Sequence, residues 1–182
     1  TLSIQFWLDN MAKGPHADVL IIGYTSCDIP VLMRYDATLT AHTTEPHLEV
    51  GVPVCYLNER GDTIVPYGKY RYCQMDTITE IGFVYENKPK KARIVCINDA
   101  GKELFYVFKC DNGPDYLKEG LFRMMDEQGR IGFADSSGNV VIHPQFSYAT
   151  PFVNGHAYVT EHGGESNERE HTTWQSDKWK II

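Results

Sequence analysis

The sequence predicts an all-β protein: repeated antiparallel three-stranded β-meander units in a curved stack, preceded by a short N-terminal helix. Three observations predict this fold. A polar turn signature recurs along the chain, apolar runs of about five residues flank each copy, and the turn glycines are almost evenly spaced. Gly61, Gly101 and Gly138 lie 40 and then 37 residues apart, and a fixed period of about 20–50 residues is typical of a repeat architecture.

The recurring turn begins with Asn or Asp and ends with Gly three residues later. Its four copies occupy residues 58–61, 98–101, 126–129 and 135–138. The side-chain oxygen at the first position can accept a hydrogen bond from the backbone two residues on, and glycine at the fourth takes positive φ without steric cost. This combination predicts hairpins in which a type I turn is followed by a left-handed residue in a bulge.

The apolar runs around these turns read as short strands joined in meanders. They cover residues 82–86, 92–97, 102–107, 120–125, 130–134, 139–143, 155–160 and 178–182. A second glycine series, formed by Gly82, Gly120 and Gly155, begins three of the copies. Such a glycine at a strand margin usually marks a bulge or a close backbone approach, which we expect here.

The first fifty residues do not follow the repeat, and we expect them to cap it. Apolar residues at helical spacing predict a short amphipathic helix, with a strand as the alternative; they are Ile4, Trp7, Leu8 and Met11. Residues 18–25 and 31–35 read as strands, and the polar stretch 36–46 as a loop. A cap of this kind covers the core and strand edges that a terminal repeat would expose.

Length and composition favour one folded domain over residues 1–182, with a cap region at 1–50 and degenerate repeats at 51–182. A chain of 182 residues with 42% hydrophobic content can bury roughly 70% of its unfolded surface. The last repeat is interrupted by the polar segment 161–177 and ends in mid-repeat. An open array and a closed assembly are both compatible with this pattern, because a strand from the N-terminal region could complete the last repeat.

The charge balance argues against two classes of partner. A net charge of −7 disfavours nonspecific nucleic-acid binding, which needs a positive surface. No apolar stretch approaches the roughly 18 residues that a membrane span needs, so we expect none. A local basic cluster of Lys88, Lys90, Lys91 and Arg93 reads as a solvated turn that discourages edge pairing, with anion binding as the alternative.

The cysteines indicate a reducing compartment. They are odd in number and form no CxxC pair; they are Cys27, Cys55, Cys73, Cys96 and Cys110. Cys55 and Cys96 lie about one repeat apart on predicted strands, which favours small buried thiols over disulfides. We therefore expect a cytoplasmic protein. An exported form with its signal removed is the alternative, because the sequence begins at Thr1 without Met.

The segment 130–160 contains the steps Pro144-Gln145-Phe146 and Pro151-Phe152, followed by Gly155, Ala157 and Val159. In this pattern it resembles the bacterial WG-repeat (KWG-repeat) family. The family pattern runs Lys-Trp-Gly-aromatic, a Gly turn, aliphatics, Pro-Gln-aromatic, then Ala, Pro-Phe, Gly, Ala and Val. Matching steps include Pro144-Gln145-Phe146, Pro151-Phe152 and the later Lys178-Trp179. Ile131 stands where the family has Trp, and Lys180 where it has Gly. The resemblance implies a β-rich scaffold associated with protein interaction, and it brings no shared catalytic residues.

No motif in the chain points to catalysis or to a cofactor. There is no GxGxxG, GxxxxGK[ST] or GxSxG sequence, so we predict no catalytic residue, no cofactor and no enzyme. The best metal candidates lie in the 161–177 segment and are Glu161, His162, Glu165, Glu168, Glu170 and His171. Imidazole and carboxylate suit zinc, but the two histidines are spaced more loosely than zinc ligands usually are, so we assign no metal site.

We therefore expect a noncatalytic scaffold that binds a protein or peptide through the repeat face and the 161–177 loop, with strand addition at an exposed edge. A small-molecule or metal-binding sensor domain centred on that loop is the alternative, and an enzyme with an unrecognised site is a further one. Recurring aromatic residues offer a second candidate surface; they are Tyr67, Tyr70, Tyr72, Phe146, Tyr148, Phe152 and Tyr158. We expect most of them to pack between sheets.

Overall fold

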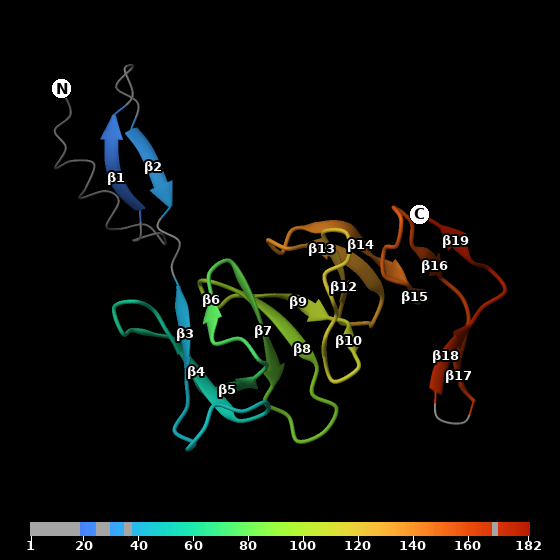
Figure 1. Cartoon of the computed structure of the whole chain (residues 1–182), viewed down its shortest axis with the longest axis horizontal. Helices are drawn as coiled ribbons and strands as arrows, with labels where there is room; N and C mark the ends of the chain where they lie inside the picture. The colour runs from blue at the N-terminus through green and yellow to red at the C-terminus, as the bar shows by residue number, and fades with distance from the viewer. Residues whose placement is uncertain (1–18, 25–29, 35–37, 169–170) are drawn as a thin grey trace. The chain divides into compact units, whose positions relative to one another are not determined.

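The computed structural model describes residues 19–24, 30–34, 38–168 and 171–182, and the chain divides into two compact units, Thr1–Ala37 and Thr38–Ile182. The first unit contains the antiparallel pair β1 (Val19–Tyr24) and β2 (Pro30–Arg34), which confirms the two strands predicted there (Figure 1). The helix predicted from residues 4–11 lies outside the described residues.

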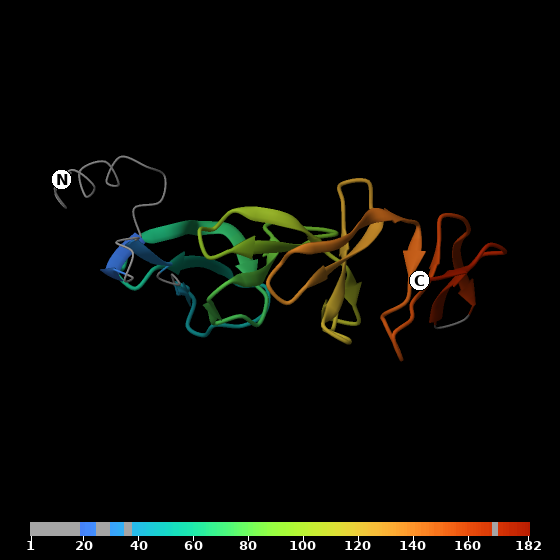
Figure 2. The same ribbon diagram turned by 90° about the horizontal axis from the view of Figure 1, so that it is seen from above.

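A ten-stranded antiparallel sheet forms most of the second unit. In sequence order its strands are β3 (Leu39–His42), β4 (Pro53–Leu57), β5 (Thr63–Tyr72), β6 (Thr77–Ile78), β7 (Ile81–Glu86), β8 (Ile94–Asn98), β9 (Glu103–Val107), β12 (Leu121–Met125), β13 (Ile131–Asp135) and β14 (Val140–Phe146). Their order across the sheet is β14-β13-β12-β9-β8-β7-β5-β4-β3-β6. Figure 2 shows the general progression of this part of the chain from teal through green to orange. Successive meanders therefore join edge to edge.

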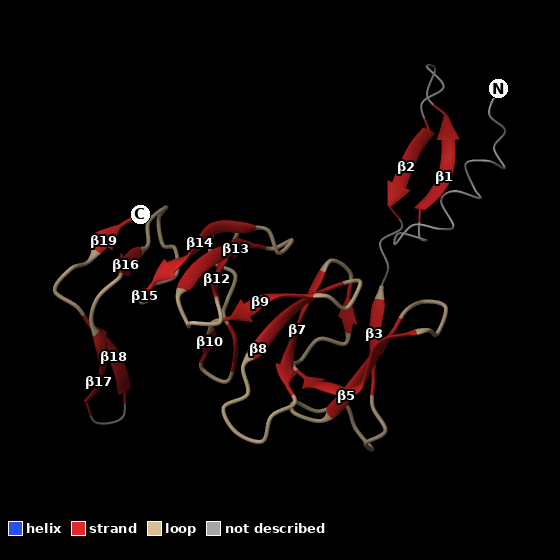
Figure 3. Cartoon of the chain, turned by 180° about the vertical axis from the view of Figure 1, so that it is seen from behind, coloured by secondary structure: helices blue, strands red, loops and turns tan. Residues whose placement is uncertain are grey.

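Three smaller antiparallel sheets complete the second unit. One pairs β10 (Lys109–Cys110) with β11 (Gly113–Pro114), and another pairs β17 (Gly164–Glu168) with β18 (His171–Gln175). The third has the order β15 (Tyr148–Ala149), β16 (Tyr158–Thr160) and β19 (Lys180–Ile181). The described residues hold strands and loops without a helix, which confirms the all-β prediction (Figure 3). Accordingly, no helix in these residues is long and apolar enough to cross a membrane.

The predicted turn is confirmed in all four copies. In the second copy the Gly101 amide donates to the Asn98 carbonyl oxygen at 2.9 Å. Asn98 Oδ1 also accepts from the backbone amides of Ala100 (3.1 Å) and Lys102 (2.9 Å). The glycine that ends each copy has positive φ, between 70° and 84°. The Asn or Asp side chain thus satisfies the backbone donors of a turn that only the glycine completes without strain.

The repeat is also visible in how successive hairpins pack. The β4–β5, β8–β9 and β13–β14 pairs share one register shift, which leaves an extra residue on the second strand: Ile64, Leu104 and Val141. A methyl group added to Gly101 would lie 3.2 Å from Ile64 Cγ2, and one added to Gly138 would lie 3.2 Å from Leu104 Cδ1. The turns at Gly101 and Gly138 therefore pack on the bulged residue of the preceding copy.

The fourth copy is completed by the last strand. Met124 of β12 pairs with Gly132 of β13, and in the same way Val159 of β16 pairs with Lys180 of β19. A second strand is thus confirmed for that copy, but it covers only Lys180–Ile181 of the predicted run 178–182. The closed assembly is not found among the described residues, because β19 lies at an edge of its three-stranded sheet.

The expectation for the second glycine series is wrong at two of its three members. Gly120 and Gly155 have positive φ and follow Glu119 and Asn154, which also have positive φ. Each pair forms the centre of a two-residue hairpin turn, closed by the bridges 118–121 and 153–156, and two adjacent left-handed residues are characteristic of type I′ turns. Gly82 instead lies inside β7, where the side chain of Ile78 fills the space of its missing Cβ.

Two segments that read as loops contain strands. The stretch 36–46 holds β3, where Leu39 and Ala41 point into the core and alternate with exposed Thr40 and His42. Burial of one face offsets the polar character of this short strand. The segment 161–177 holds β17 and β18, so the predicted polar loop is a β-hairpin.

Buried apolar side chains of the second unit form three core clusters, which follow the repeats along the chain. Cys96 is fully buried at the position that Tyr56 and Phe133 occupy in other copies, so Cys55 is not its counterpart. Desolvation raises the pKa of the Cys96 thiol to about 12. The prediction of a small buried thiol is confirmed for Cys73 and Cys96, while Cys55 and Cys110 are half-buried.

Candidate functional site

The aromatic residues singled out from the sequence are mostly covered, as expected. Tyr70, Tyr72 and Phe146 are buried, and Tyr148 and Phe152 are half-buried. The two exposed members are Tyr67 and Tyr158. Of these, Tyr158 lies on β16, in the sheet that also contains Tyr148, so the search for a surface begins there.

In the sequence, the hairpin of β17 and β18 is inserted between β16 and β19, the two strands of the fourth copy. Glu165 pairs with Trp174 along it, and Glu168 pairs with His171 near its tip. At the base, the hydroxyl oxygens of Thr160 and Ser176 lie 2.8 Å apart and form a hydrogen bond. The hairpin is therefore tied to the end of β16.

This hairpin separates the two histidines that were the best metal candidates. His162 precedes β17 at the base, whereas His171 begins β18 at the tip. The four residue steps of β17 between them span about 13 Å of extended backbone. No group of three or more His, Cys, Asp or Glu side chains that could hold a metal ion occurs among the described residues.

Trp174 of β18 stacks on Tyr148 of β15. Their ring centroids lie 5.4 Å apart with an interplanar angle of 15°. The indole Nε1–H donates to the His162 carbonyl oxygen at 3.1 Å, so the polar tip of the ring is satisfied. Gly163 makes room for this arrangement: a Cβ there would lie 2.8 Å from Trp174 Nε1 and 2.1 Å from the Gln175 carbonyl oxygen.

Trp179 approaches the same tyrosine from another side. Its ring meets Tyr148 edge-on, with centroids 6.1 Å apart and an interplanar angle of 88°. Two residues further on, Ile181 pairs directly with Tyr158 across β16 and β19. Because side chains alternate between the two faces of a sheet, Tyr158, Trp179 and Ile181 share one face.

We call this set of five residues the aromatic face: Tyr148, Tyr158, Trp174, Trp179 and Ile181. Tyr158 is 52% exposed and Ile181 is 62% exposed, whereas Val159, which points to the other side of the sheet, is fully buried. An ion pair joins the two strands on the side of Val159, because Lys180 pairs with Val159 and its Nζ lies 2.8 Å from Glu161 Oε1. The hydrogen bond from Lys180 lowers the pKa of the Glu161 carboxyl, which keeps it charged.

The position equivalent to Tyr158 is covered in the preceding copy, where it is occupied by Arg123. The Arg123 amide donates to Asp115 Oδ2 at 2.9 Å, and the Tyr158 amide donates correspondingly to Thr150 Oγ1 at 3.0 Å. Arg123 is buried, and its guanidinium reaches the Ala149 carbonyl oxygen of the following copy at 3.0 Å. Arg123 and Tyr158 thus occupy equivalent positions in successive copies. Arg123 is covered by the following copy, whereas Tyr158 is exposed.

The chemistry of the face suits binding rather than proton transfer. Two indoles, two phenols and an isoleucine offer apolar area with a few hydrogen-bonding tips. The strongly shifted titratable groups lie elsewhere: burial raises the pKa of the Tyr85 phenol and of the Tyr72 phenol to about 12. These side chains are hydrogen-bonded and neutral, Tyr72 to Asp76 and Tyr85 to the Asn112 carbonyl oxygen.

Sequence reasoning found two of the five residues and missed the others. Tyr148 and Tyr158 were among the recurring aromatics, but Trp174, Trp179 and Ile181 were not considered as surface. A usable signal was present. Trp179 and Ile181 follow the polar segment at the spacing of Ile131 and Phe133, so the strand pattern places them on one side of β19.

Comparisons with known proteins identify one repeat. The family model of the WG-containing repeat matches residues 131–164. No curated protein and no solved structure matches the chain. The matched segment begins with β13 and runs through β14, β15 and β16 to the base of the β17–β18 hairpin, so it includes Tyr148 and Tyr158 of the aromatic face. The chain therefore contains a segment, residues 131–164, that matches the WG-containing repeat.

Proposed function

We propose that the chain is a noncatalytic β-repeat scaffold that binds a protein or peptide through the aromatic face. The observation that carries this proposal is the exposed pair Tyr158 and Ile181 beside the packed cluster of Tyr148, Trp174 and Trp179. A solvent-exposed group of large apolar side chains marks an interaction site more often than isolated exposed residues do.

The cluster is already arranged for binding. Trp174 is fixed by its stack on Tyr148 and by its hydrogen bond to the His162 carbonyl oxygen. A partner would therefore lose little side-chain freedom here, and rigid aromatic residues give contact area at low entropic cost. β19 is the outer strand of its sheet, so a partner strand beside Ile181 could also pair with its backbone.

A peptide-display selection on the whole chain tests the proposal. Peptides enriched on the wild-type protein are counter-selected on the double variant Tyr158→Ser/Ile181→Ser, and individual survivors are measured by calorimetry. The matched control is Tyr116→Ser/Leu117→Ser, which removes two exposed apolar side chains outside the aromatic face.

We expect peptides that bind the wild type and the control alike but bind the Tyr158/Ile181 variant about tenfold more weakly or worse, as loss of central apolar contacts predicts. Equal binding to both variants would contradict the aromatic face as the site. Failure to enrich any peptide on the wild type would contradict the peptide-binding function itself.

A further inference from the structure

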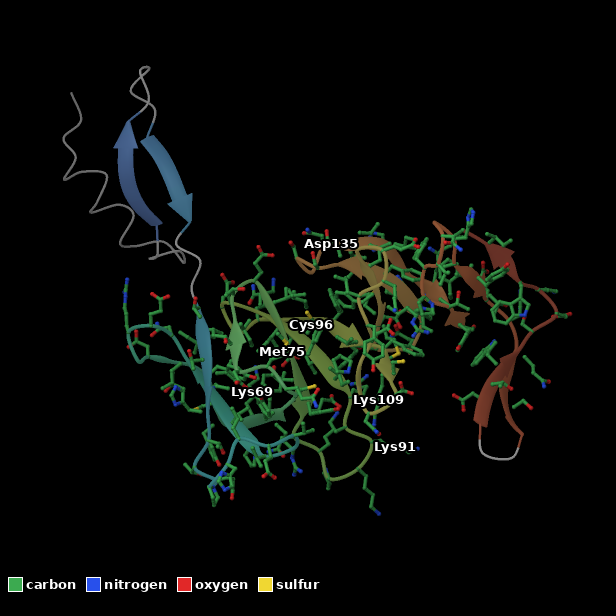
Figure 4. The ribbon with its side chains drawn as sticks, viewed as in Figure 1. Lys69, Met75, Lys91, Cys96, Lys109 and Asp135 are labelled. Atoms are coloured by element: carbon green, nitrogen blue, oxygen red, sulfur yellow. The ribbon has the colours of Figure 1, made fainter. Side chains whose placement is uncertain are left out.

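A cavity of about 370 Å³ lies on the second unit, lined by residues from β5, from the loop after β7 and from β10. Five of its lining residues are cationic: Arg71, Lys88, Lys90, Lys91 and Lys109. No carboxylate lines it. We call it the basic pocket; Figure 4 labels Lys91 and Lys109. In a chain with a net charge of −7, such a concentration of positive charge is a local reversal of the overall field.

The loop that carries three of the lysines is anchored at its base. The Asn87 side chain donates through Nδ2 to the Gly68 carbonyl oxygen at 2.6 Å and accepts from Arg71 Nε at 2.9 Å. The Glu86 carboxylate accepts from the Arg93 amide at 3.1 Å and from Lys88 Nζ at 2.8 Å. The loop is thus held against β5 by hydrogen bonds within the chain.

Most of the positive charge in the basic pocket is not neutralised by the protein. Lys88 is paired with Glu86. Lys90, Lys91 and Lys109 have no ion pair with any residue that the structure describes, and Arg71 has only the neutral Asn87 as a side-chain partner there. Four cations therefore face one cavity with their charge available to a ligand.

We propose that the basic pocket is a second binding site, separate in its chemistry from the aromatic face, and that it takes an acidic peptide segment rich in Asp and Glu. Three of the four available cations are lysines on flexible stems, which interact as separate point charges. Carboxylates spaced along an extended chain can meet such charges one by one.

The lining fits a peptide better than a phosphate group. Bidentate recognition of one compact phosphate group favours an arginine fork, and here the Nε–H of the single arginine is already donated to Asn87. The wall also includes the ring of Tyr85 together with Val50 and Pro89, which can contact the methylene groups of acidic side chains. The negative charge of the rest of the chain repels the same peptide, which favours this one location.

The test is fluorescence anisotropy with a labelled deca-glutamate peptide and the full chain at low salt. The pocket variant is Lys90→Gln/Lys91→Gln/Lys109→Gln. The matched control is Lys102→Gln/Lys118→Gln/Lys178→Gln, which changes the net charge equally at exposed lysines outside the pocket. A labelled deca-glutamine peptide and unlabelled inorganic phosphate complete the set.

We expect the wild type to bind deca-glutamate and not deca-glutamine, with affinity falling as salt rises. The pocket variant should bind about tenfold more weakly and the control less than about threefold more weakly, since each exposed charge pair contributes modestly. Equal weakening in the two triple variants would overturn the site. Displacement of the peptide by millimolar inorganic phosphate at constant ionic strength would overturn the peptide in favour of a phosphate ligand.

The Tyr158→Ser/Ile181→Ser variant separates this proposal from the preceding one. It should bind deca-glutamate as the wild type does, because it leaves the basic pocket unchanged. Loss of deca-glutamate binding in this variant would show that the peptide lies on the aromatic face and would overturn the second site. Loss in the pocket variant alone supports it, whatever the display selection finds.

Discussion

Arg123 and Asp115 form a buried, two-pronged ion pair that joins consecutive repeats. Arg123 Nε donates to Asp115 Oδ2 at 2.9 Å, and its Nη2 donates to Oδ1 at 2.6 Å. The guanidinium also lies 4.0 Å from the centre of the Phe108 ring and reaches the Ala149 carbonyl oxygen. Every polar atom of the pair thus has a partner, and the contact with Ala149 crosses into the next copy.

Removing one member of this pair should be strongly destabilising. Asp115→Ala or Arg123→Ala leaves the other charge unpaired at a site where both side chains are almost fully buried. Such a loss costs about 3–5 kcal/mol of unfolding free energy. Urea denaturation followed by circular dichroism measures the change.

The double variant Arg123→Met/Asp115→Leu is the informative control, because it removes both charges and leaves apolar side chains in their place. It should be less destabilised than the sum of the two single variants, since no charge is left unpaired. Additive losses, or single losses below about 1 kcal/mol, would contradict a coupled buried pair.

Gly132 should be intolerant of any side chain. A Cβ there would lie 2.3 Å from the Ile142 carbonyl oxygen and 2.7 Å from the Pro144 backbone nitrogen, because a bulge brings β14 close at this point. Gly132→Ala should therefore cost about 1–3 kcal/mol through overpacking against backbone.

Gly113→Ala is the matched control for this substitution, because nothing lies within 4 Å of a Cβ at that strand position. It should change the unfolding free energy by less than about 0.5 kcal/mol. Chemical denaturation of both variants compares the two sites, and equal stability would show that β14 can move away from Gly132 without cost.

The sequence predicted most reliably what is local. Asn58 and Gly61 sit in one tetrapeptide, so the turn chemistry is contained in it and appears in the structure as expected. The hairpin at 161–177 was harder to predict because its first strand, 164–168, is polar throughout. The run Thr172-Thr173-Trp174 carried a strand signal, since β-branched and aromatic residues favour strands.

Contacts between distant residues could not be read from the sequence. Trp174 meets Tyr148 only because β18 folds back beside the end of β15, and no spacing rule connects the two positions. The basic pocket is a similar case. Lys90 and Lys91 were visible as a charged run, but Arg71 and Lys109 join them only through the pairing of β5 with β7 and the path of the chain to β10.

Acid should destabilise the fold in part through Asp135. Hydrogen bonds from the Asn139 side chain and amide lower its pKa below the ordinary value of 3.8. A carboxylate with a lowered pKa in the folded state stabilises that state at neutral pH, and this contribution is lost as the pH falls below the ordinary value towards the folded one.

Asp135→Asn should reduce this acid sensitivity while keeping the turn, because Asn98 performs the same role in the second copy. Thermal unfolding at pH 7 and pH 3 measures the difference, and the drop in Tm should be smaller in the variant than in the wild type. Asp111→Asn serves as control, since that exposed carboxylate makes no hydrogen bond to any described residue. The same reduction in Asp111→Asn would mean that general charge repulsion causes the effect.

The aromatic face depends on Gly163, which is not itself one of its five residues. Gly163 has φ of +105°, and the space of its missing Cβ is taken by Gln175 and Trp174. Gly163→Ala should therefore strain the backbone, displace the indole from Tyr148 and forfeit a ring contact that is worth about 0.5–1.5 kcal/mol. The near-ultraviolet circular dichroism of the stacked rings should fall, and acrylamide should quench tryptophan emission more strongly.

Gly164→Ala, one residue on, is the matched control. It has nothing within 4 Å of its Cβ and should leave both signals unchanged. Identical spectra for the two variants would show that the stack of Trp174 on Tyr148 does not depend on the backbone at Gly163.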